Sequence, residues 1–190
     1  MRVLGTLLIT VSIWAQDYRT SATGAPPPQL APEVRQALQN RGTKVVDPNG
    51  FVFCELWLRS APVSEGQSLP EALQAGAVPQ GALVGAVRYA SPGADRQGRG
   101  FGPGVYTLRY AEGSSVLMIR AGDDPNLEPP EQLEALSRKV SRSEAPAALR
   151  LTQGSPGSSP RLRITREGEW ILEVALDGAP LALLIVGVAR

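Results

Sequence analysis

A series of short β-type segments, each bounded by turn residues, constrains the fold of this chain more than any other feature. Val, Ile, Leu, Phe and Tyr concentrate in short runs that Gly, Pro, Ser or Asp separate, as is typical of strands joined by tight turns. The runs cover residues 51–60, 82–89, 104–110, 115–121, 147–153, 161–168, 170–178 and 180–188. Since no βαβ rhythm alternates through them, they predict a mainly β protein, an antiparallel β-sandwich or open barrel of about 7–8 strands.

Two helices are expected beside the strands. Residues 31–42 contain a proline that suits a first helical turn, apolar residues at helical spacing, and Gly42 as a stop. Residues 129–142 have an apolar stripe, with acidic residues early and basic residues late, as the helix dipole favours. The expected fold is therefore mainly β with two short helices.

The N-terminus has the parts of a secretory signal peptide. Arg2 gives a positive start, an apolar run extends from Val3 to Trp14, and Ala15 is a small residue suited to cleavage before Gln16. The alternative is a membrane anchor, but the run is shorter than the roughly 20 residues that span a bilayer. We expect a signal peptide over residues 1–15, a Pro-rich tether over 16–31 and a single β-rich domain over 32–190. The expected location is the periplasm or the exterior, with no transmembrane segment after cleavage.

Composition excludes several kinds of chemistry. The chain of 190 residues has a formal net charge of +1, which predicts no bulk attraction to nucleic acid. It contains no histidine, so Ser-His-Asp catalysis and His-based metal sites are excluded in their usual form. Cys54 is the single cysteine and cannot form an internal disulfide, so we expect an inert core residue there. We expect no cofactor and no metal.

The candidate binding residues are Glu55, Trp57, Arg59, Arg88 and Arg109. Glu55 alternates with Phe53 and Trp57 on one face of the first strand, and an acid beside an aromatic ring is a plausible sugar site. In the alternative interpretation, Trp57 packs in a second apolar layer and Glu55 pairs with Arg59 or Arg88.

Two further groups of residues have competing interpretations. The segment "AGDDPNLEPPE" (121–131) offers oxygen ligands for calcium, but it lacks the EF-hand register and suits the start of a helix equally well. Arg161 and Arg163 share a strand face that could bind an anion or guard a sheet edge against aggregation.

The stretch "GRGFGPGVYTLRY" (98–110) resembles a phosphate loop only at first sight. Its glycines lie at every second position, which is not the dinucleotide fingerprint, and β-branched residues lead into a strand rather than a helix. Alternation then places Tyr106 and Tyr110 in the core and Arg109 on the opposite face. Arg109 could meet solvent, a salt-bridge partner or a ligand.

The blocks "LVGAVRY" (83–89) and "PGVYTLRY" (103–110), with "RG" between them, resemble a family of uncharacterised exported proteins from acidobacteria-type bacteria. The resemblance covers about half of the mature chain and implies export and a β-rich fold, but no known activity. Members of that group have a longer, histidine-containing insertion where this chain has only "AEGSS" (111–115). A ligand or metal site in that insertion would be missing here.

Three functions fit the sequence. The first is a non-enzymatic exported β-sandwich that acts as a binding or envelope-associated module, with an envelope protein or a carbohydrate as partner. The second is a carboxylate-dependent hydrolase of envelope or extracellular polysaccharide, which needs two carboxylates about 5–10 Å apart. The third is a structural module that binds a partner by pairing at a sheet edge.

Overall fold

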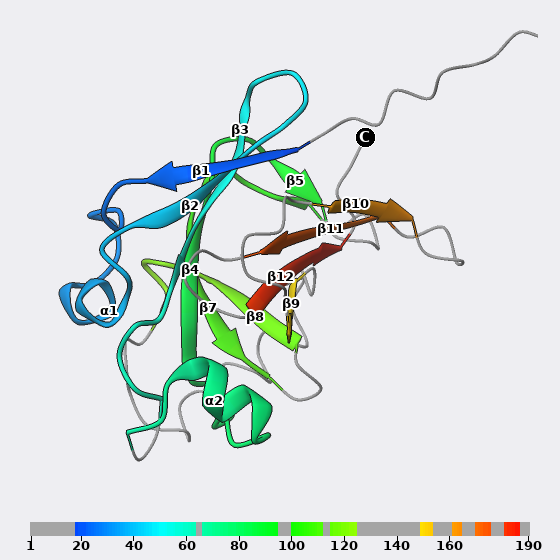
Figure 1. The fold of residues 1–190 in the computed structure, drawn as a ribbon. Coiled ribbons are helices and arrows are strands. Elements are labelled where there is room, and N and C mark those ends of the chain that lie inside the picture. Colours follow the sequence, from blue (N-terminus) through cyan, green and yellow to red (C-terminus); the bar gives the residue numbers. More distant parts are fainter. Residues whose placement is uncertain are drawn as a thin grey trace, which may run out of the picture.

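A computed structural model gives the fold (Figure 1). It describes residues 18–63, 66–94, 100–111, 115–124, 149–153, 161–164, 170–175 and 181–186. The first elements are β1 (Arg19–Thr23), α1 (Pro32–Ala37), β2 (Gly42–Val46), β3 (Val52–Leu58), α2 (Leu69–Gln74), β4 (Leu83–Tyr89) and β5 (Gly93–Ala94). The later elements are β6 (Gly100–Phe101), β7 (Gly104–Tyr110), β8 (Ser115–Arg120), β9 (Leu149–Gln153), β10 (Arg161–Ile164), β11 (Trp170–Ala175) and β12 (Leu181–Val186).

Ten of these strands form one antiparallel sheet in the order β1-β2-β3-β4-β7-β8-β9-β12-β11-β10, and β5 pairs with β6 separately. The sheet is not closed, because β1 and β10 are its two edges. The prediction of a mainly β, antiparallel fold with two short helices is therefore confirmed.

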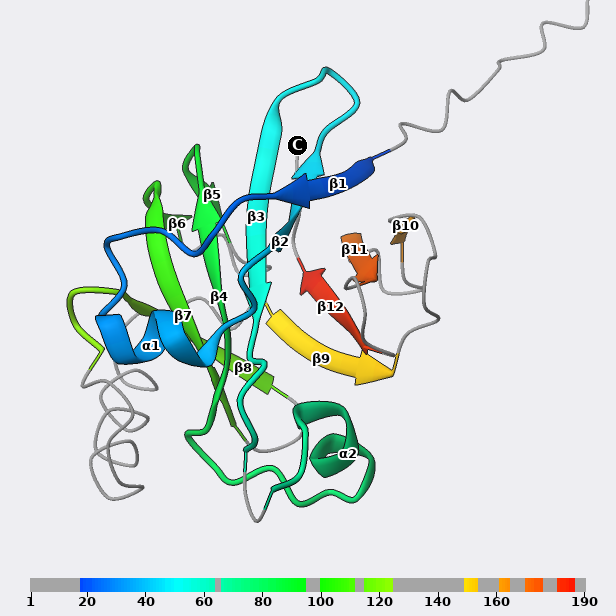
Figure 2. The same cartoon turned by 60° about the vertical axis from the view of Figure 1, so that its left-hand side comes forward.

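The main core lies between the two halves of this sheet. Buried side chains of β2, β3, β4, β7 and β8 pack in one cluster with Leu172, Val174, Leu183 and Ile185 of β11 and β12. The halves join where β8 and β9 pair over only two residues of each strand, Ser115 with Arg150 and Val116 with Leu149. In both ribbon views β11 and β12 lie on one side of β3 and β4, and α1 lies on the other (Figures 1 and 2).

A second, smaller cluster fills the face toward α1. Leu30 and Val34, from the α1 region, pack there with Trp57, Leu83 and Val105 of the sheet. We call this side of β3, β4 and β7 the α1 face. Because both faces of these central strands are covered, hydrophobic burial stabilises the sheet from two sides.

Helix α1 ends five residues earlier than the sequence predicts. Leu38 adopts an extended conformation and pairs with Arg59, while Gly42 begins β2 rather than stopping a helix. A side chain at Gly42 would place a Cβ 2.4 Å from the Leu56 carbonyl and 2.7 Å from the Trp57 indole nitrogen. Glycine is needed there for close packing of β2 on β3.

The second helix of the structure, α2, is not the one that the sequence predicts. The predicted helix at 129–142 lies outside the described residues. In α2, the backbone N–H and hydroxyl of Ser68 both donate to Glu71 Oε2, at 2.9 and 2.7 Å. Ser68 and Glu71 stand three residues apart and form a capping box, the sequence signal that could have located this helix.

The sequence predicts an extended tether over residues 16–31, yet residues 19–23 of this segment pair with β2 as the edge strand β1. Short polar residues dominate this strand, and none of residues 18–25 is buried. Strand β1 pairs with β2 through backbone hydrogen bonds, which do not depend on the side chains. Its sequence therefore lacks the apolar alternation by which a strand is recognised.

A β-bulge changes the expected faces of β3. Val45 pairs with Cys54 while its neighbour Val46 pairs with Val52, so Phe53 is an extra residue in the ladder. A bulge of this type can turn two successive side chains toward the same side. Phe53 accordingly packs with Cys54 in the main core and does not share the face of Glu55 and Trp57 as the sequence alternation predicts.

Candidate functional site

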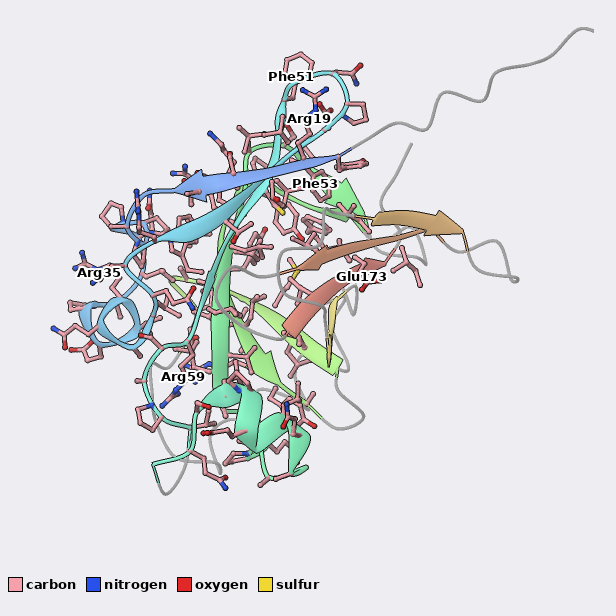
Figure 3. The ribbon with its side chains drawn as sticks, viewed as in Figure 1. Arg19, Arg35, Phe51, Phe53, Arg59 and Glu173 are labelled. Atoms are coloured by element: carbon pink, nitrogen blue, oxygen red, sulfur yellow. The ribbon has the colours of Figure 1, made fainter. Side chains whose placement is uncertain are left out.

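Strand pairing brings the five candidate residues to one face of the sheet, the α1 face. Glu55 of β3 lies opposite Arg88 of β4, and Trp57 lies opposite Ala86. On the other side of β4, Leu83 pairs with Arg109 of β7. Strand alternation puts Arg59 on the same face, and Figure 3 shows its side chain on the side of the sheet that bears α1.

Glu55 is held by two partners, one from the adjacent strand β4 and one from β1, which lies beyond β2. Thr23 Oγ1 donates to Glu55 Oε1, and Arg88 donates to Glu55 Oε2 and forms an ion pair with it. The Glu55 side chain is buried, whereas that of Arg88 is 47% exposed. Of the two pairings considered from the sequence, the structure has the one with Arg88.

Trp57 is part of the second apolar layer. Its ring is buried in the cluster beneath α1, and its indole N–H donates to the Gly24 carbonyl at 2.8 Å. A Cβ at Gly85 would approach the Trp57 carbonyl to 2.5 Å, so glycine is needed on β4 as well as at Gly42 on β2. A ring packed in this way offers no face on which a sugar could stack.

Arg109 meets a salt-bridge partner. Its Nη2 lies 2.8 Å from Asp124 Oδ1, its Nε donates to Asp124 Oδ2 at 3.1 Å, and its Nη1 donates to the Gly81 carbonyl at 3.3 Å. Both side chains of the pair are only 2% exposed. The bidentate geometry compensates for the cost of burying two charges, and it ties the chain after β8 to β7.

Arg59 closes the loop that follows β3. Its Nε donates to the carbonyls of Ala61 at 2.9 Å and Pro62 at 3.1 Å. Burial lowers the pKa of the Arg59 guanidinium, and the charge of Arg109 adds to this shift. Arg59 therefore has a structural role within its own loop.

An aromatic row runs along the main-core side near the starts of β3 and β7. Adjacent ring centroids lie 4.7 to 6.4 Å apart, mostly in edge-to-face arrangements that such pairs favour. The row consists of Tyr18, Phe53, Tyr89, Phe101 and Tyr106. Sequence reasoning missed it because the bulge at Phe53 and the β5–β6 pairing bring its members together.

The tyrosines of this row differ in their hydroxyl groups. The hydroxyl of Tyr106 is partly buried and donates to the Gly102 carbonyl at 2.8 Å. The hydroxyl of Tyr89 is buried without a hydrogen-bond partner among the described residues, and burial raises its pKa well above the ordinary value. The pKa of the Cys54 thiol is also raised by burial, which keeps it protonated and unreactive as the sequence predicts.

The turn between β2 and β3 presents an aromatic side chain to solvent. Asp47 Oδ1 accepts the backbone N–H groups of Asn49 at 2.9 Å and Phe51 at 2.8 Å, and the Asp47 N–H donates to the Phe51 carbonyl. Gly50 supplies the positive φ of 88° that this turn requires. Phe51 is 71% exposed and lies at the tip of a projecting hairpin (Figures 1 and 3).

The described residues contain no group of three or more His, Cys, Asp or Glu side chains that could hold a metal ion. Asp124, from the acidic segment considered for calcium, is paired with Arg109. Within the same part of the chain, neither helix is long and apolar enough to cross a bilayer.

Searches with this chain against protein-family models, curated proteins and solved structures find no match. The resemblance to exported acidobacterial proteins stays a prediction. Function must therefore be argued from the side chains themselves.

Proposed function

We propose that the protein is an exported, non-enzymatic binding module of the cell envelope, with the β2–β3 hairpin as part of its contact surface. Export rests on the signal-peptide pattern of residues 1–15. The binding role is inferred from the structure of the hairpin tip between β2 and β3. A network of backbone bonds to Asp47 holds it in shape, and it exposes Phe51.

A preformed loop with an exposed ring suits recognition because little conformational entropy is lost on binding. Aromatic rings pack on the apolar faces of sugars and on protein surfaces alike. The partner is therefore an envelope carbohydrate or an envelope protein, and both share this chemistry.

The use of Glu55 supports a binding role over hydrolysis. A general acid must be able to exchange its proton with substrate. Here the Glu55 carboxylate is an ion-pair partner of Arg88 and an acceptor for Thr23, and Trp57 is buried beneath α1. Glu55 and Trp57 therefore stabilise the packing of the α1 face.

The binding role is tested by sedimenting the full chain with purified cell envelopes, before and after protease treatment of the envelopes. We expect co-sedimentation that Phe51→Ser reduces about tenfold, the typical loss for an aromatic anchor. Gln74→Ser, at an exposed position of α2, is the matched control and should bind normally. Loss of binding after protease treatment indicates a protein partner, and its persistence indicates a carbohydrate.

Equal binding by Phe51→Ser and the parent chain would refute the role of the hairpin. Release of reducing sugar ends from envelope polysaccharide, abolished by Glu55→Gln, would refute the non-enzymatic function. Export is tested separately by sequencing the N-terminus of the chain recovered outside the cytoplasm, where we expect Gln16 as the first residue.

A further inference from the structure

We infer that β1 is an exchangeable strand, and that the edge of β2 accepts β1 from a second copy of this chain to form a two-fold symmetric dimer. This goes beyond the proposed binding function and does not depend on it. Three observations carry the inference: how weakly β1 is held, what it leaves behind, and how it is connected.

Strand β1 is held almost entirely by polar contacts at the surface. Its five residues pair with β2 through the backbone, from Arg19 opposite Val46 to Thr23 opposite Gly42. The preceding Tyr18 adds one edge-to-face ring contact with Phe53, with centroids 5.9 Å apart. Since no side chain of residues 18–25 is buried, β1 belongs to the part of the fold that opens at low free-energy cost.

The site beneath β1 cannot stay empty at the same low cost. Departure of β1 removes the Thr23 hydroxyl from the buried Glu55 carboxylate and the Gly24 carbonyl from the buried Trp57 indole N–H. It also frees the backbone edge of β2. Unpaired buried groups and free strand edges are unfavourable, so a second strand with the same hydroxyl and carbonyl spacing should bind there.

The connection after β1 permits exchange. Gly24 lies in open surroundings, with no atom within 4 Å of an added Cβ, and glycine has the backbone freedom that a hinge needs. Ala25 precedes Pro26, which restricts Ala25 to extended conformations, and Pro27 is buried and anchors the following chain. An extended connection lets β1 reach a neighbouring copy once it has left its own sheet.

A second copy of the same segment is the favoured occupant. An exchanged β1 makes every contact that the original makes, which gives the copy of the same segment the best fit. The dimer therefore gains no new interface energy from β1 itself, and its population should rise with protein concentration.

The inference is tested with variants that add one cysteine to the full chain, whose own Cys54 is buried. Ser21 lies opposite Lys44 across β1 and β2, at a spacing that a disulfide can bridge. We mix tagged Ser21→Cys with untagged Lys44→Cys at high concentration, then oxidise. Exchange predicts a mixed disulfide about tenfold more abundant than with Gln36→Cys, an exposed control on α1, in place of Ser21→Cys.

A second measurement avoids cysteine altogether. Isotope-labelled and unlabelled parent chains are mixed, and native mass spectrometry should detect a dimer of intermediate mass. Only monomers in this experiment, with a mixed disulfide no more abundant than in the control, would overturn the inference. Disulfides between two Ser21→Cys chains, without the mixed product, would overturn it in favour of side-by-side pairing of the two β1 edges.

Discussion

Two ion pairs lie on the same face of the same sheet and differ in how they are enclosed. Arg109 and Asp124 are both 2% exposed and hold each other through bidentate contacts. Glu55 is equally enclosed, but its partner Arg88 is 47% exposed and its second partner belongs to the edge strand β1. The Arg109–Asp124 pair is buried inside the fold, whereas the Glu55–Arg88 pair is partly exposed and is contacted by the edge strand β1.

An arginine–carboxylate pair can therefore serve different roles in one fold, depending on how it is enclosed. A fully enclosed pair contributes mainly by avoiding the penalty of a single unpaired charge, so it locks the segments that supply it. A pair with a solvated member tolerates rearrangement because water can replace a lost contact. The α1 face therefore has a fixed end at Arg109 and an adaptable end at Glu55.

The largest expected effect is from breaking the enclosed pair. Asp124→Asn removes the buried carboxylate that makes bidentate contacts with Arg109, so we expect a loss of about 3–5 kcal/mol in the free energy of unfolding. Arg88→Gln should cost less, about 1–3 kcal/mol, because the Gln amide can still donate to the buried Glu55 carboxylate and water reaches this half-exposed position. Urea unfolding monitored by tryptophan fluorescence measures both, and equal losses would contradict the comparison.

The next effect concerns the packing of Trp57 between these two ends. Gly42→Ala forces a Cβ against the Leu56 carbonyl and the indole ring, so we expect a loss of about 1–3 kcal/mol. Gly100→Ala is the matched control, since its nearest neighbour would lie at 3.8 Å. Denaturant midpoints should fall for the first variant only. A stable Gly42→Ala variant would mean that β2 can move away from β3.

A smaller effect is expected at the adaptable end. Thr23→Val keeps the shape of the side chain but removes the hydroxyl that donates to Glu55, at a cost of about 1 kcal/mol. Amide hydrogen exchange should accelerate in residues 19–23 and 42–46 and stay unchanged in β7. Faster exchange in β7 as well would show that the two ends of the α1 face are coupled.

The smallest effect tests a region outside this face. The two hydrogen bonds from Ser68 lower the pKa of the Glu71 carboxyl, so the ionised form is favoured in the folded state. Its small contribution to stability is present above the unfolded pKa and is lost as pH falls through the folded pKa. A carboxyl titration by NMR should show the pKa of Glu71 rising part of the way toward its ordinary value in Ser68→Ala, because the hydroxyl is lost and the backbone N–H of residue 68 remains. An unchanged value would exclude the Ser68 hydroxyl as a cause of the shift.

The sequence predicts β3, β4 and β7 to β12 because alternating apolar residues and turn residues mark them clearly, but it does not predict the two-residue strands β5 and β6. It also places Tyr106 in the core and makes Glu55 a partner of Arg88 in one of two interpretations. Alternation within each strand is a local pattern, which is why the sequence alone indicates which side chains share a face.

Long-range features were not accessible in this way. Asp124 is the partner of Arg109, but nothing in the acidic segment around it distinguishes an ion-pair partner from a helix-start residue or a calcium ligand. The polar strand β1 has no pattern of its own and exists because β2 offers it an edge. Glu55 and Trp57 share a face of β3 as the alternation predicts, and the packing of Trp57 under α1 depends on a helix far from it in the chain.

The bulge at Phe53 has a consequence for how this gene can vary. Loss of one residue from a strand ordinarily shifts every side chain beyond it to the opposite face. Here the flanking pairs, Val45 with Cys54 and Val46 with Val52, would become consecutive rungs of a regular ladder if residue 53 were deleted. An in-frame deletion of codon 53 would therefore leave the residues on either side of it facing the same sides of the sheet as before. The hairpin that bears Phe51 would lose the ring of Phe53 but keep its pairing register.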